Sequence, residues 1–289
     1  MILVATCSAY PHPTPSLEAL LDALRALGAE ADHRPWKTTP PAAFAAADAV
    51  LPLCCWDYHS NPAAFLAWID VLEAHGARSI NTPAALRWNF RKTYLLEIAA
   101  AGLAVPPTVH LQAVDADAVA QHMEAQGWPT AVLKPVSGQS GYGVRKFDGA
   151  EQVRRTLDPA PFDEALLQEF QADMASLGET TLTFIEGDFS HAVRRILKAG
   201  EWRANQQFGI TYERVCVSPE VVEAAKASLS LAPEMPLYAR VDGIVRPNGF
   251  MLMELELIEP YLYLELAPGS AERMARAIME RVRSRERRI

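Results

Sequence analysis

Residues 132–144, VLKPVSGQSGYGV, place a lysine at the end of an apolar stretch and three glycines shortly after it. Glycine lets backbone N–H groups approach an anion closely, because it has no side chain in the way and adopts positive φ angles readily. Lys134 adds a positive charge beside those groups. The stretch therefore predicts a flap that closes over phosphate. A glycine-rich surface hairpin with an outward-pointing lysine is the alternative.

This flap differs from the better-known glycine-rich loops. A P-loop carries Lys-Ser or Lys-Thr after its last glycine and opens a helix, whereas Val144 follows Gly143 and the chain continues in an extended form. The dinucleotide-binding fingerprint also opens a helix. A protein-kinase loop has its lysine downstream of the glycines. The remaining arrangement is a strand, a flap and a second strand, with Lys134 just before the flap.

A second group of chemically capable residues lies in residues 238–258, YARVDGIVRPNGFMLMELELI, which predict two strands joined by a tight turn. Side chains alternate between the two faces of a strand. Glu254 and Glu256 therefore share one face, and the apolar residues around them take the other. Arg240 and Asp242 likewise share a face of the first strand.

The length of the turn decides whether these two faces coincide. A two-residue loop at 248–249 would place Asp242 opposite Leu255, whereas a three-residue loop at 247–249 would place Asp242 opposite Glu254. Proline at the first position and glycine at the last favour the three-residue form. We therefore expect one surface to carry four side chains, namely Arg240, Asp242, Glu254 and Glu256.

Three carboxylates crowded on one surface repel one another unless water or cations neutralise them. Magnesium is a hard cation that prefers oxygen ligands and is commonly shared with substrate phosphates, so it suits such a group. An exposed sheet face with ordinary alternation is the alternative. A cationic flap together with an acidic hairpin is what a metal–nucleotide site requires.

Further motifs follow in a consistent order along the chain. They are Phe90-Arg91-Lys92, Gly102–Thr108, Leu167–Phe170, Gly178-Glu179 and Trp202-Arg203-Ala204-Asn205. Together with the flap and the acidic hairpin, these motifs resemble the ATP-grasp superfamily over most of residues 83–268. The resemblance implies ATP and Mg²⁺ as cofactors.

The resemblance also implies roles for individual residues. It implies nucleotide binding by Lys92, Lys134, Ser137, Gly138, Ser140, Gly141, Tyr142, Gly143, Gln168, Glu169, Phe170 and Glu179. It implies metal binding by Asp242, Glu254 and Glu256, and stabilisation of the transferred phosphoryl group by Arg203 and Arg240. The family commonly has Glu-x-Asn where this chain has Glu254-Leu255-Glu256, so the metal keeps an oxygen ligand and the site gains a negative charge.

A narrower resemblance concerns the substrate. Residues 56–59, 190–194 and 254–260 are similar to the ATP-grasp branch that contains the O-ureido-serine cyclo-ligase of cycloserine biosynthesis. Tyr261 stands where a small residue is expected in that branch, so the same substrate does not follow. The residues expected near the substrate are Trp56, Asp57, Tyr58, His191, Arg194 and Asn205.

The elements around these residues favour a mixed α/β fold. Strands at Ile2–Cys7 and Ala49–Cys55 alternate with helices at Ser16–Leu27 and Phe65–Leu72, as in an open parallel sheet whose ligands collect at the carboxyl ends of the strands. Residues 56–59 follow such an end; a polar loop with one aromatic side chain tucked under it is the alternative.

The C-terminal half predicts antiparallel strands, and the resemblance implies an ATP-grasp fold of three parts. A helix is expected at Asn89–Ala101, with Asn89 as its N-cap. The proposed parts are an N-terminal substrate-side α/β domain (1–82), a central subdomain with the flap (83–165) and a C-terminal subdomain with the magnesium site (166–289).

Composition narrows the class of protein. A chain of 289 residues suits two or three subdomains, and its 50% hydrophobic and 21% charged residues are typical of a globular protein. The net charge of −8 argues against a nucleic-acid-binding surface. No stretch reaches the roughly 18 apolar residues of a membrane span, and the N-terminus carries no basic leader.

The four cysteines have no CxxC spacing, so we expect buried thiols in a reducing, cytoplasmic compartment. They are Cys7, Cys54, Cys55 and Cys216. The last helix, from Ala271 onward, ends in the arginine-rich residues 281–288, which we interpret as a solvated helix end and not as a nucleic-acid-binding arm. The oligomeric state stays open, with a homodimer as one option.

We therefore expect an ATP-dependent, ADP-forming ligase for a small carboxylate or amino-acid-like carbonyl compound. A substrate oxygen would attack the γ-phosphoryl group to give an acyl phosphate or its equivalent, and a nitrogen would then displace phosphate. A kinase that releases a phosphorylated small molecule and a non-catalytic nucleotide-binding module are the alternatives. The module is disfavoured because both lysines and all three carboxylates are present.

Overall fold

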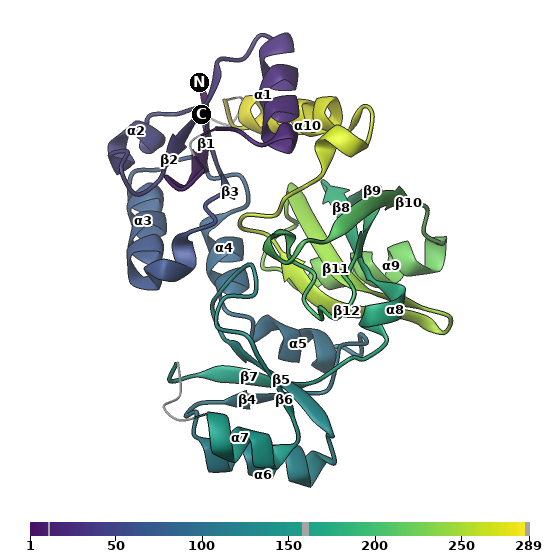
Figure 1. The fold of residues 1–289 in the computed structure, drawn as a ribbon. Coiled ribbons are helices and arrows are strands. Elements are labelled where there is room, and N and C mark those ends of the chain that lie inside the picture. Colours follow the sequence, from purple (N-terminus) through teal and green to yellow (C-terminus); the bar gives the residue numbers. More distant parts are fainter. Residues whose placement is uncertain (11, 158–161, 287–289) are drawn as a thin grey trace.

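The computed structural model describes residues 1–10, 12–157 and 162–286, and the strands form three sheets (Figure 1). One sheet is parallel and two are antiparallel, which confirms the expected mixed α/β fold. The strands are β1 (Ile2–Thr6), β2 (Ala31–Pro35), β3 (Ala49–Cys54), β4 (Thr108–Leu111), β5 (Thr130–Pro135), β6 (Arg145–Asp148), β7 (Ala165–Glu169), β8 (Glu179–Ile185), β9 (Asp188–Ile196), β10 (Thr211–Val215), β11 (Tyr238–Arg246) and β12 (Gly249–Glu256). The α-helices are α1 (Pro15–Ala26), α2 (Pro41–Ala45), α3 (Pro62–Ala74), α4 (Pro83–Phe90), α5 (Tyr94–Ala100), α6 (Ala116–Gln126), α7 (Ala150–Thr156), α8 (Met174–Leu177), α9 (Pro219–Ala227) and α10 (Ser270–Glu286).

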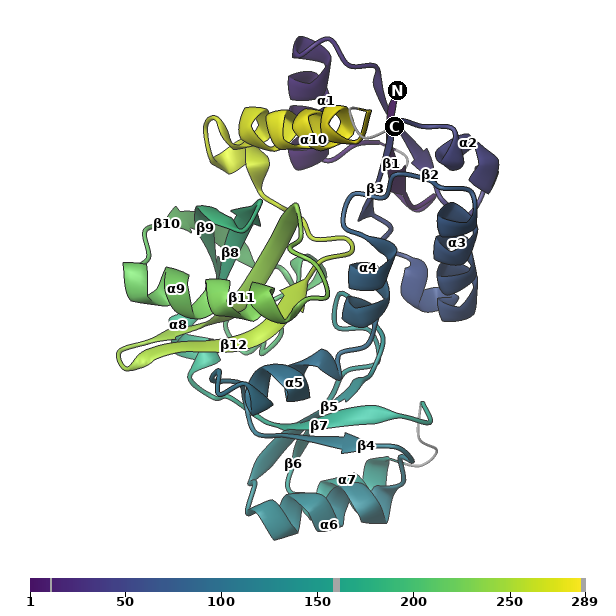
Figure 2. The ribbon, with the colours of Figure 1, turned by 180° about the vertical axis from the view of Figure 1, so that it is seen from behind.

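The N-terminal sheet has the strand order β2-β1-β3, and its strands are parallel. Every residue of β3 is buried, as expected of a parallel sheet covered on both faces. Helices α1 and α10 pack on one face, and α2 and α3 pack on the other (Figure 2). The C-terminal helix therefore completes the N-terminal layer. The sequence missed β2, because its residues are mostly polar and half-buried.

The central sheet has the order β4-β7-β5-β6 and is antiparallel. The flap, residues 136–144, joins β5 to β6, as the sequence predicts. Helices α6 and α7 cover one face, and α5 lies between the other face and the C-terminal sheet (Figures 1 and 2). Strand β7 starts at the proposed boundary between residues 165 and 166 and pairs with β4 and β5, so a boundary after β7 follows the sheets better.

The C-terminal sheet has the order β10-β9-β8-β11-β12 and is also antiparallel. Alternation gives it two contrasting faces. Leu182, Phe184 and Val241 belong to the apolar cluster that includes α9. The opposite face carries polar side chains that are nevertheless buried, including Arg240 and Asp242. Buried charges need partners, so this polar face is where chemistry is expected.

The turn between β11 and β12 differs from the prediction. Arg246 pairs with Gly249, so the loop consists of two residues, Pro247 and Asn248. The three-residue loop expected from the sequence is therefore wrong. A tight loop of this length would by itself shift the pairing of the hairpin by one residue and turn the carboxylates away from each other.

A β-bulge in β12 corrects that shift. Asp242 pairs with Glu254, whereas the next residue, Gly243, pairs with Leu252. Met253 is thus the extra residue of the bulge, and it moves every later residue of β12 to the opposite face. The predicted pairing of Asp242 with Glu254 is confirmed, but it results from a short turn and a bulge.

The helix predicted at residues 89–101 is in fact two helices, α4 and α5. Asn89 lies inside α4 and is not an N-cap. Its side chain is buried, donates a hydrogen bond to the Leu255 carbonyl and accepts one from the Leu257 N–H, each at 2.8 Å. Asn89, which the sequence predicts to be a helix N-cap, therefore anchors the end of β12. The break between the helices contains Lys92, whose N–H donates to the Val136 carbonyl at 2.6 Å.

Asn81 makes a similar anchor between the N-terminal and C-terminal sheets. It is 1% exposed and adopts φ +58°, a conformation that asparagine tolerates better than most residues. Its side-chain NH₂ donates to the carbonyls of Tyr238 and Leu257, and its oxygen accepts from the Leu237 N–H, each at 2.8 Å. One side chain thus fixes β11 and the segment after β12 to the chain that follows the N-terminal sheet.

Three of the four cysteines are buried, as expected, but Cys216 is exposed because it follows the edge strand β10. Arg283 in α10 is exposed, consistent with a solvated helix end; the arginines at 287 and 288 lie outside the described residues. Across residues 1–10, 12–157 and 162–286, no helix combines the length and the apolar character that crossing a membrane would require.

Replacing Asn81 is expected to destabilise the fold. Asn81→Ala removes the partners of three buried backbone groups and places alanine at a positive φ, so the free energy of unfolding should fall by about 3 kcal/mol. Urea denaturation followed by tryptophan fluorescence measures this loss. Asn248→Ala, in the exposed turn, is the control and should change stability little. Equal stabilities of the two variants would contradict the anchoring role of Asn81.

Candidate active site

A cleft with about 960 Å³ of open space lies between the central sheet and the C-terminal sheet. Its walls come from the flap, β5, β7, β12 and the segment 202–205. The structure brings most of the predicted site residues to this cleft. Those that line it are Lys92, Lys134, Gly138, Ser140, Gly141, Tyr142, Gln168, Glu169, Phe170, Glu179, Arg203, Asn205 and Glu254.

Two predicted flap residues, Ser137 and Gly143, are not part of that lining. Gly143 instead supplies a positive φ of +69° where the flap returns to β6. A Cβ atom at Gly143 would lie 3.3 Å from the Phe162 ring, so the position is also tightly packed. Its glycine is explained by backbone shape and packing.

The end of the cleft near β7 suits a flat apolar ring. Leu95, Val132, Phe170 and Met253 contribute apolar surface there. The Lys146 ammonium lies 4.5 Å from the centroid of the Phe170 ring, which adds a cation to this end. The side chain of Gln168 is tied to Thr108 Oγ1 at 3.0 Å, so its orientation is fixed by the protein.

The flap is closed and is held from two sides. The Gln139 side chain donates a hydrogen bond to the Trp56 carbonyl, and the ring centroids of Tyr142 and His59 are 4.7 Å apart. On the other side, the Gln207 side chain donates to the Ser140 carbonyl at 2.5 Å. The flap thus contacts the loop after β3 and the loop before β10 at the same time, which shields the cleft from water.

Gly141 at the tip of the flap permits a close approach to Asn205. A Cβ atom at this position would lie 2.9 Å from Asn205 Oδ1, and the residue has φ +71°. A larger residue would have to push the flap away from the 202–205 segment. Of the three flap glycines, Gly141 therefore has the clearest structural reason to be glycine.

Two lysines with different surroundings enter the cleft. Burial above all, together with the nearby Lys92, lowers the pKa of Lys134 to about 8, although Glu254 acts in the opposite direction. Lys92 is hydrogen-bonded to Glu254. Burial alone would lower the pKa of Lys92, but the charge of Glu254 and this hydrogen bond raise it above its ordinary value. Lys92 is thus a paired cation, and Lys134 is poorly compensated until an anion binds.

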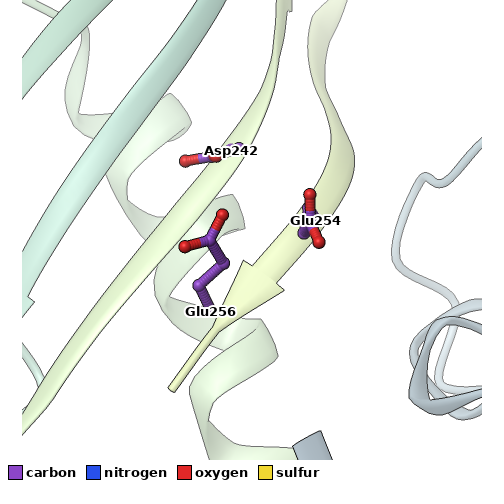
Figure 3. Close-up of side chains that lie close together, drawn as sticks. All are labelled: Asp242, Glu254 and Glu256. Carbon is purple, nitrogen blue, oxygen red and sulfur yellow. The ribbon is translucent and has the colours of Figure 1, made fainter. Parts of the chain in front are cut away.

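The three predicted metal ligands meet at one point. Oxygen atoms of Asp242, Glu254 and Glu256 all lie within 4.8 Å of one another, from the adjacent strands β11 and β12 (Figure 3). We call these residues the acidic trio. A set of three carboxylates at a cleft wall fits a hard divalent cation such as Mg²⁺, which takes oxygen ligands and completes its shell with water or phosphate.

Each carboxylate of the acidic trio is paired with a cation. Arg240 Nε donates to Asp242 Oδ1 at 2.9 Å, and Arg240 Nη2 also contacts Glu256. Arg195 Nη1 donates to Asp242 Oδ2 at 3.2 Å. Lys92 is bonded to Glu254. The pairs explain how three carboxylates remain close together inside the protein.

The pKa values of the carboxyl groups reflect this balance. Burial raises the pKa of Glu256 to about 7, and burial likewise raises that of Glu179 to about 7. Burial would also raise the pKa of Asp242, but Arg195 and Arg240 together lower it below the ordinary value. Near neutral pH, binding of a cation can therefore favour loss of a proton from Glu256 or Glu179, which increases the negative charge of the site.

The sequence missed Arg195, which the structure places at the centre of the site. The residue is 6% exposed, its Nη1 donates to Glu179 at 2.8 Å, and its Nε donates to Tyr263 Oη at 3.1 Å. The predicted substrate residue Arg194 points the other way, is exposed and pairs with Glu213. Successive residues of a strand face opposite sides, so one position separates the two outcomes.

Other residues expected near the substrate also lie elsewhere. Tyr58 is 5% exposed and packs against Phe65 and Phe90, so it is the tucked aromatic of the alternative interpretation. His191 is buried, and its Nε2 lies 2.8 Å from the Leu262 carbonyl. Neither side chain lines the cleft. Substrate contact by either side chain therefore stays a prediction.

Trp56 and Asp57 stay at the rim of the site. Trp56 Nε1 donates to the Glu259 carbonyl at 2.9 Å, which ties the loop after β3 to the segment after β12. Asp57 accepts from Trp36 Nε1 at 2.7 Å and pairs with Lys37 at 2.8 Å. Trp56 thus borders both the flap and the acidic strands, whereas Asp57 mainly holds its own loop.

Two family models match this chain. Residues 2–81 match the N-terminal domain of D-cycloserine synthetase DcsG, and residues 98–262 match the prokaryotic glutathione synthetase ATP-grasp domain. The cycloserine biosynthesis protein DcsG of Streptomyces lavendulae is 30% identical over 91% of this chain and 93% of that protein. A glutathione synthetase of Synechocystis sp. is 31% identical over 49% of this chain and 43% of that protein.

Solved structures give the same picture. A crystal structure of D-cycloserine synthetase DcsG superposes with a TM-score of 0.83 at 28% identity, covering 98% of this chain and 100% of that one. The D-alanine–D-alanine ligase of Bacillus anthracis superposes with a TM-score of 0.69 at 15% identity, covering 100% of this chain and 99% of that one. The latter likeness shows a shared fold.

The Lys134 ammonium is expected to titrate near pH 8, because burial and Lys92 both disfavour its charged form. NMR of lysine labelled at Cε, recorded between about pH 7 and 11, measures the midpoint directly. The variant Lys134→Arg identifies the signal by its disappearance. A midpoint at the ordinary value of about 10.4 would contradict the burial of this group.

Proposed function

This chain belongs to the ATP-grasp superfamily, in the branch of the cycloserine biosynthesis protein DcsG, and it is an ADP-forming ligase; we propose that it activates an amino-acid-like carboxylate or carbonyl compound for C–N bond formation. The activated species is proposed to be an acyl phosphate or its equivalent. That relative is named for D-cycloserine synthesis, and we propose ring closure within one substrate as one form of the reaction.

One observation carries the proposal. Glu254 lines the cleft beneath the flap, is bonded to Lys92 and belongs to the acidic trio. Glu254 therefore links the cationic lysine side of the cleft to the acidic trio, although these residues are far apart in the sequence. A site in which phosphate-binding cations and metal-binding carboxylates meet is suited to phosphoryl transfer, where catalysis is mostly positioning and electrostatics.

The residues that would hold the nucleotide are those of the cleft. We propose that the apolar end beside Phe170 takes the adenine, with Gln168 and Glu169 at its edge. Lys92, Lys134 and the N–H groups of the flap would then surround the triphosphate. Bound Mg²⁺ would supply positive charge between the acidic trio and the phosphate oxygens. The Lys92–Glu254 ion pair must separate when the nucleotide and the metal bind. Lys92 would then pair with phosphate, and Glu254 would pair with Mg²⁺.

The proposed chemistry has two steps. A substrate oxygen attacks the γ-phosphorus, the bond from that phosphorus to the β,γ-bridging oxygen breaks, and ADP leaves. A nitrogen lone pair then attacks the activated carbon, the carbon–oxygen bond to phosphate breaks, and the nitrogen loses a proton. Arg203, whose Cζ lies 3.5 Å from the Phe208 ring centroid, is proposed to stabilise the negative charge that develops on the transferred group.

Arg240 is better suited to a positioning role than to direct contact. Two of its nitrogens are occupied by Asp242 and Glu256, and Nη1 donates to the Tyr261 carbonyl at 3.1 Å. It also lies outside the lining of the cleft. We propose that Arg240 holds the acidic trio together and compensates the extra charge of Glu256, which stands where relatives commonly have asparagine.

Tyr261 argues for a substrate that differs from that of the cycloserine branch. Its ring centroid is 4.8 Å from that of Tyr263, and its hydroxyl donates to Glu265 Oε1 at 2.9 Å. A large side chain therefore stands just after the acidic strands, where a small one is expected in that branch. We propose an amino-acid-like substrate of different shape and do not assign cycloserine as the product.

The ligase function is tested by product stoichiometry. With Mg²⁺, ATP and a panel of amino acids and dipeptides, a substrate should give ADP and free phosphate in equal amounts, with one condensed product each time. Coupled assays and mass spectrometry measure all three. ADP without free phosphate would indicate a kinase, and no ADP with any compound would contradict enzymatic activity.

Two variants serve as controls for that assay. Glu254→Gln keeps the size of the side chain but loses its charge, so kcat should fall at least about a hundredfold. Glu213→Gln, at an exposed carboxylate paired with Arg194 outside the cleft, should keep the wild-type rate. Wild-type turnover by Glu254→Gln would contradict the proposed role of the acidic trio.

A further inference from the structure

Glu259 is a buried carboxylate that the proposed mechanism does not use. It lies three residues after the end of β12 and is 7% exposed. Among residues 1–10, 12–157 and 162–286, no hydrogen bond or ion pair involves its carboxylate; only its backbone carbonyl has a partner, Trp56 Nε1. Its oxygens are not among the fully enclosed polar atoms without a partner, so they keep a small accessible surface.

The backbone around Glu259 is held rigidly on both sides. Before it, the Leu257 N–H donates to Asn89, and the Ile258 carbonyl accepts from Tyr238 Oη at 2.9 Å. After it, the Tyr261 carbonyl accepts from Arg240. An unpartnered carboxylate on so well-fixed a segment is positioned in advance, which is how binding groups for small ligands are commonly built.

The cations whose charge acts on the Glu259 carboxyl group are already paired. Lys92 and Arg240 both influence its carboxyl group electrostatically. However, Lys92 is bonded to Glu254, and Arg240 is bonded to Asp242 and Glu256. A buried carboxylate without a cation is costly in its ionised form. A cation that binds beside the Glu259 carboxylate would remove this cost.

Glu259 lies on the side of the site where the substrate is expected. Trp56, in the loop that follows the carboxyl end of β3, donates a hydrogen bond to the Glu259 carbonyl. Ligands of parallel sheets collect at this end of the strands. Glu259 thus lies between the N-terminal sheet and the acidic trio, outside the nucleotide cleft.

A second metal ion is not the best occupant of this position. In the described part of the chain, the group of three or more side chains close enough to share a metal ion is the acidic trio, and Glu259 does not belong to it. A single carboxylate beside apolar and aromatic groups is a poor magnesium site, because that ion needs several oxygen ligands. An organic cation needs only one carboxylate and tolerates apolar neighbours.

We propose that Glu259 binds the ammonium group of the substrate, so that the compound activated by this ligase carries a free amino group. This inference rests on the proposed function. The ammonium would lie beside Glu259 while the reacting oxygen of the same molecule points toward the acidic trio. Burial raises the pKa of the Glu259 carboxyl well above its ordinary value, and a bound ammonium would favour the ionised form.

Calorimetric titration of the full chain tests this inference. The probes are serine, O-ureidoserine and cycloserine in both D and L forms, each with its N-acetyl derivative, with and without saturating Mg²⁺·ADP. We expect at least one free amino compound to bind the wild type and its N-acetyl derivative to bind at least about tenfold more weakly. Glu259→Gln should weaken the amino compound by a similar factor, since an amide cannot pair with ammonium.

The controls separate binding of the substrate from folding and from nucleotide binding. Glu259→Gln should bind Mg²⁺·ADP with the wild-type affinity, and Glu213→Gln should bind both ligands as the wild type does. Glu259→Asp, which keeps the charge, should still prefer the amino compound over its N-acetyl form. This variant decides the matter if the glutamine variant does not fold.

Three results would overturn the role of Glu259. They are unchanged affinity of the amino compound in Glu259→Gln, equal binding of amino and N-acetyl forms to the wild type, and no binding of any amino compound in the panel. Failure of Mg²⁺·ADP to bind the wild type would instead contradict the proposed function. The titrations without nucleotide would then still decide whether Glu259 binds an amine.

Discussion

Repulsion among the three carboxylates of the acidic trio is the constraint that the surrounding structure has to satisfy. Asp242 is 1% exposed, so water does little to relieve this repulsion. Arg240, Arg195 and Lys92 relieve it through ion pairs from β11, β9 and the break between α4 and α5. These cations come from three separate parts of the chain: Arg195 and Arg240 from the C-terminal sheet, and Lys92 from the segment between α4 and α5.

The geometry of the site follows from the bulge in β12. Without the extra residue at Met253, the two-residue turn would place the glutamates on the apolar face that packs against α9. Gly243 opposite the bulge allows this close approach, since a Cβ atom there would lie 2.4 Å from the Met251 carbonyl. The polar face then meets the flap across the cleft. Glu259 follows three residues after the end of β12.

Sequence reasoning predicted the features that depend on local pattern. Alternation and glycine content predicted strands on both sides of the cleft, the flap, and the pairing of Asp242 with Glu254, the last through a turn of the wrong length. It failed where tertiary contacts decide the outcome: Asn89 binds β12 and does not cap a helix, and Arg195 faces the site in place of Arg194. Glu259 lies in a motif that the sequence analysis noted, but no role followed from it, because a carboxylate becomes exceptional only when its surroundings deny it a partner.

The central claim is that Lys134 beneath the flap and the acidic trio face the same bound metal–nucleotide complex. Paramagnetic broadening tests it most directly: Mn²⁺·ADP is added to protein labelled at lysine Cε, and the Lys134 signal is followed by NMR. The signal should broaden strongly in the wild type and recover in Glu254→Gln at the same Mn²⁺ concentration. A Lys134 signal that stays sharp with saturating Mn²⁺·ADP would contradict a shared site.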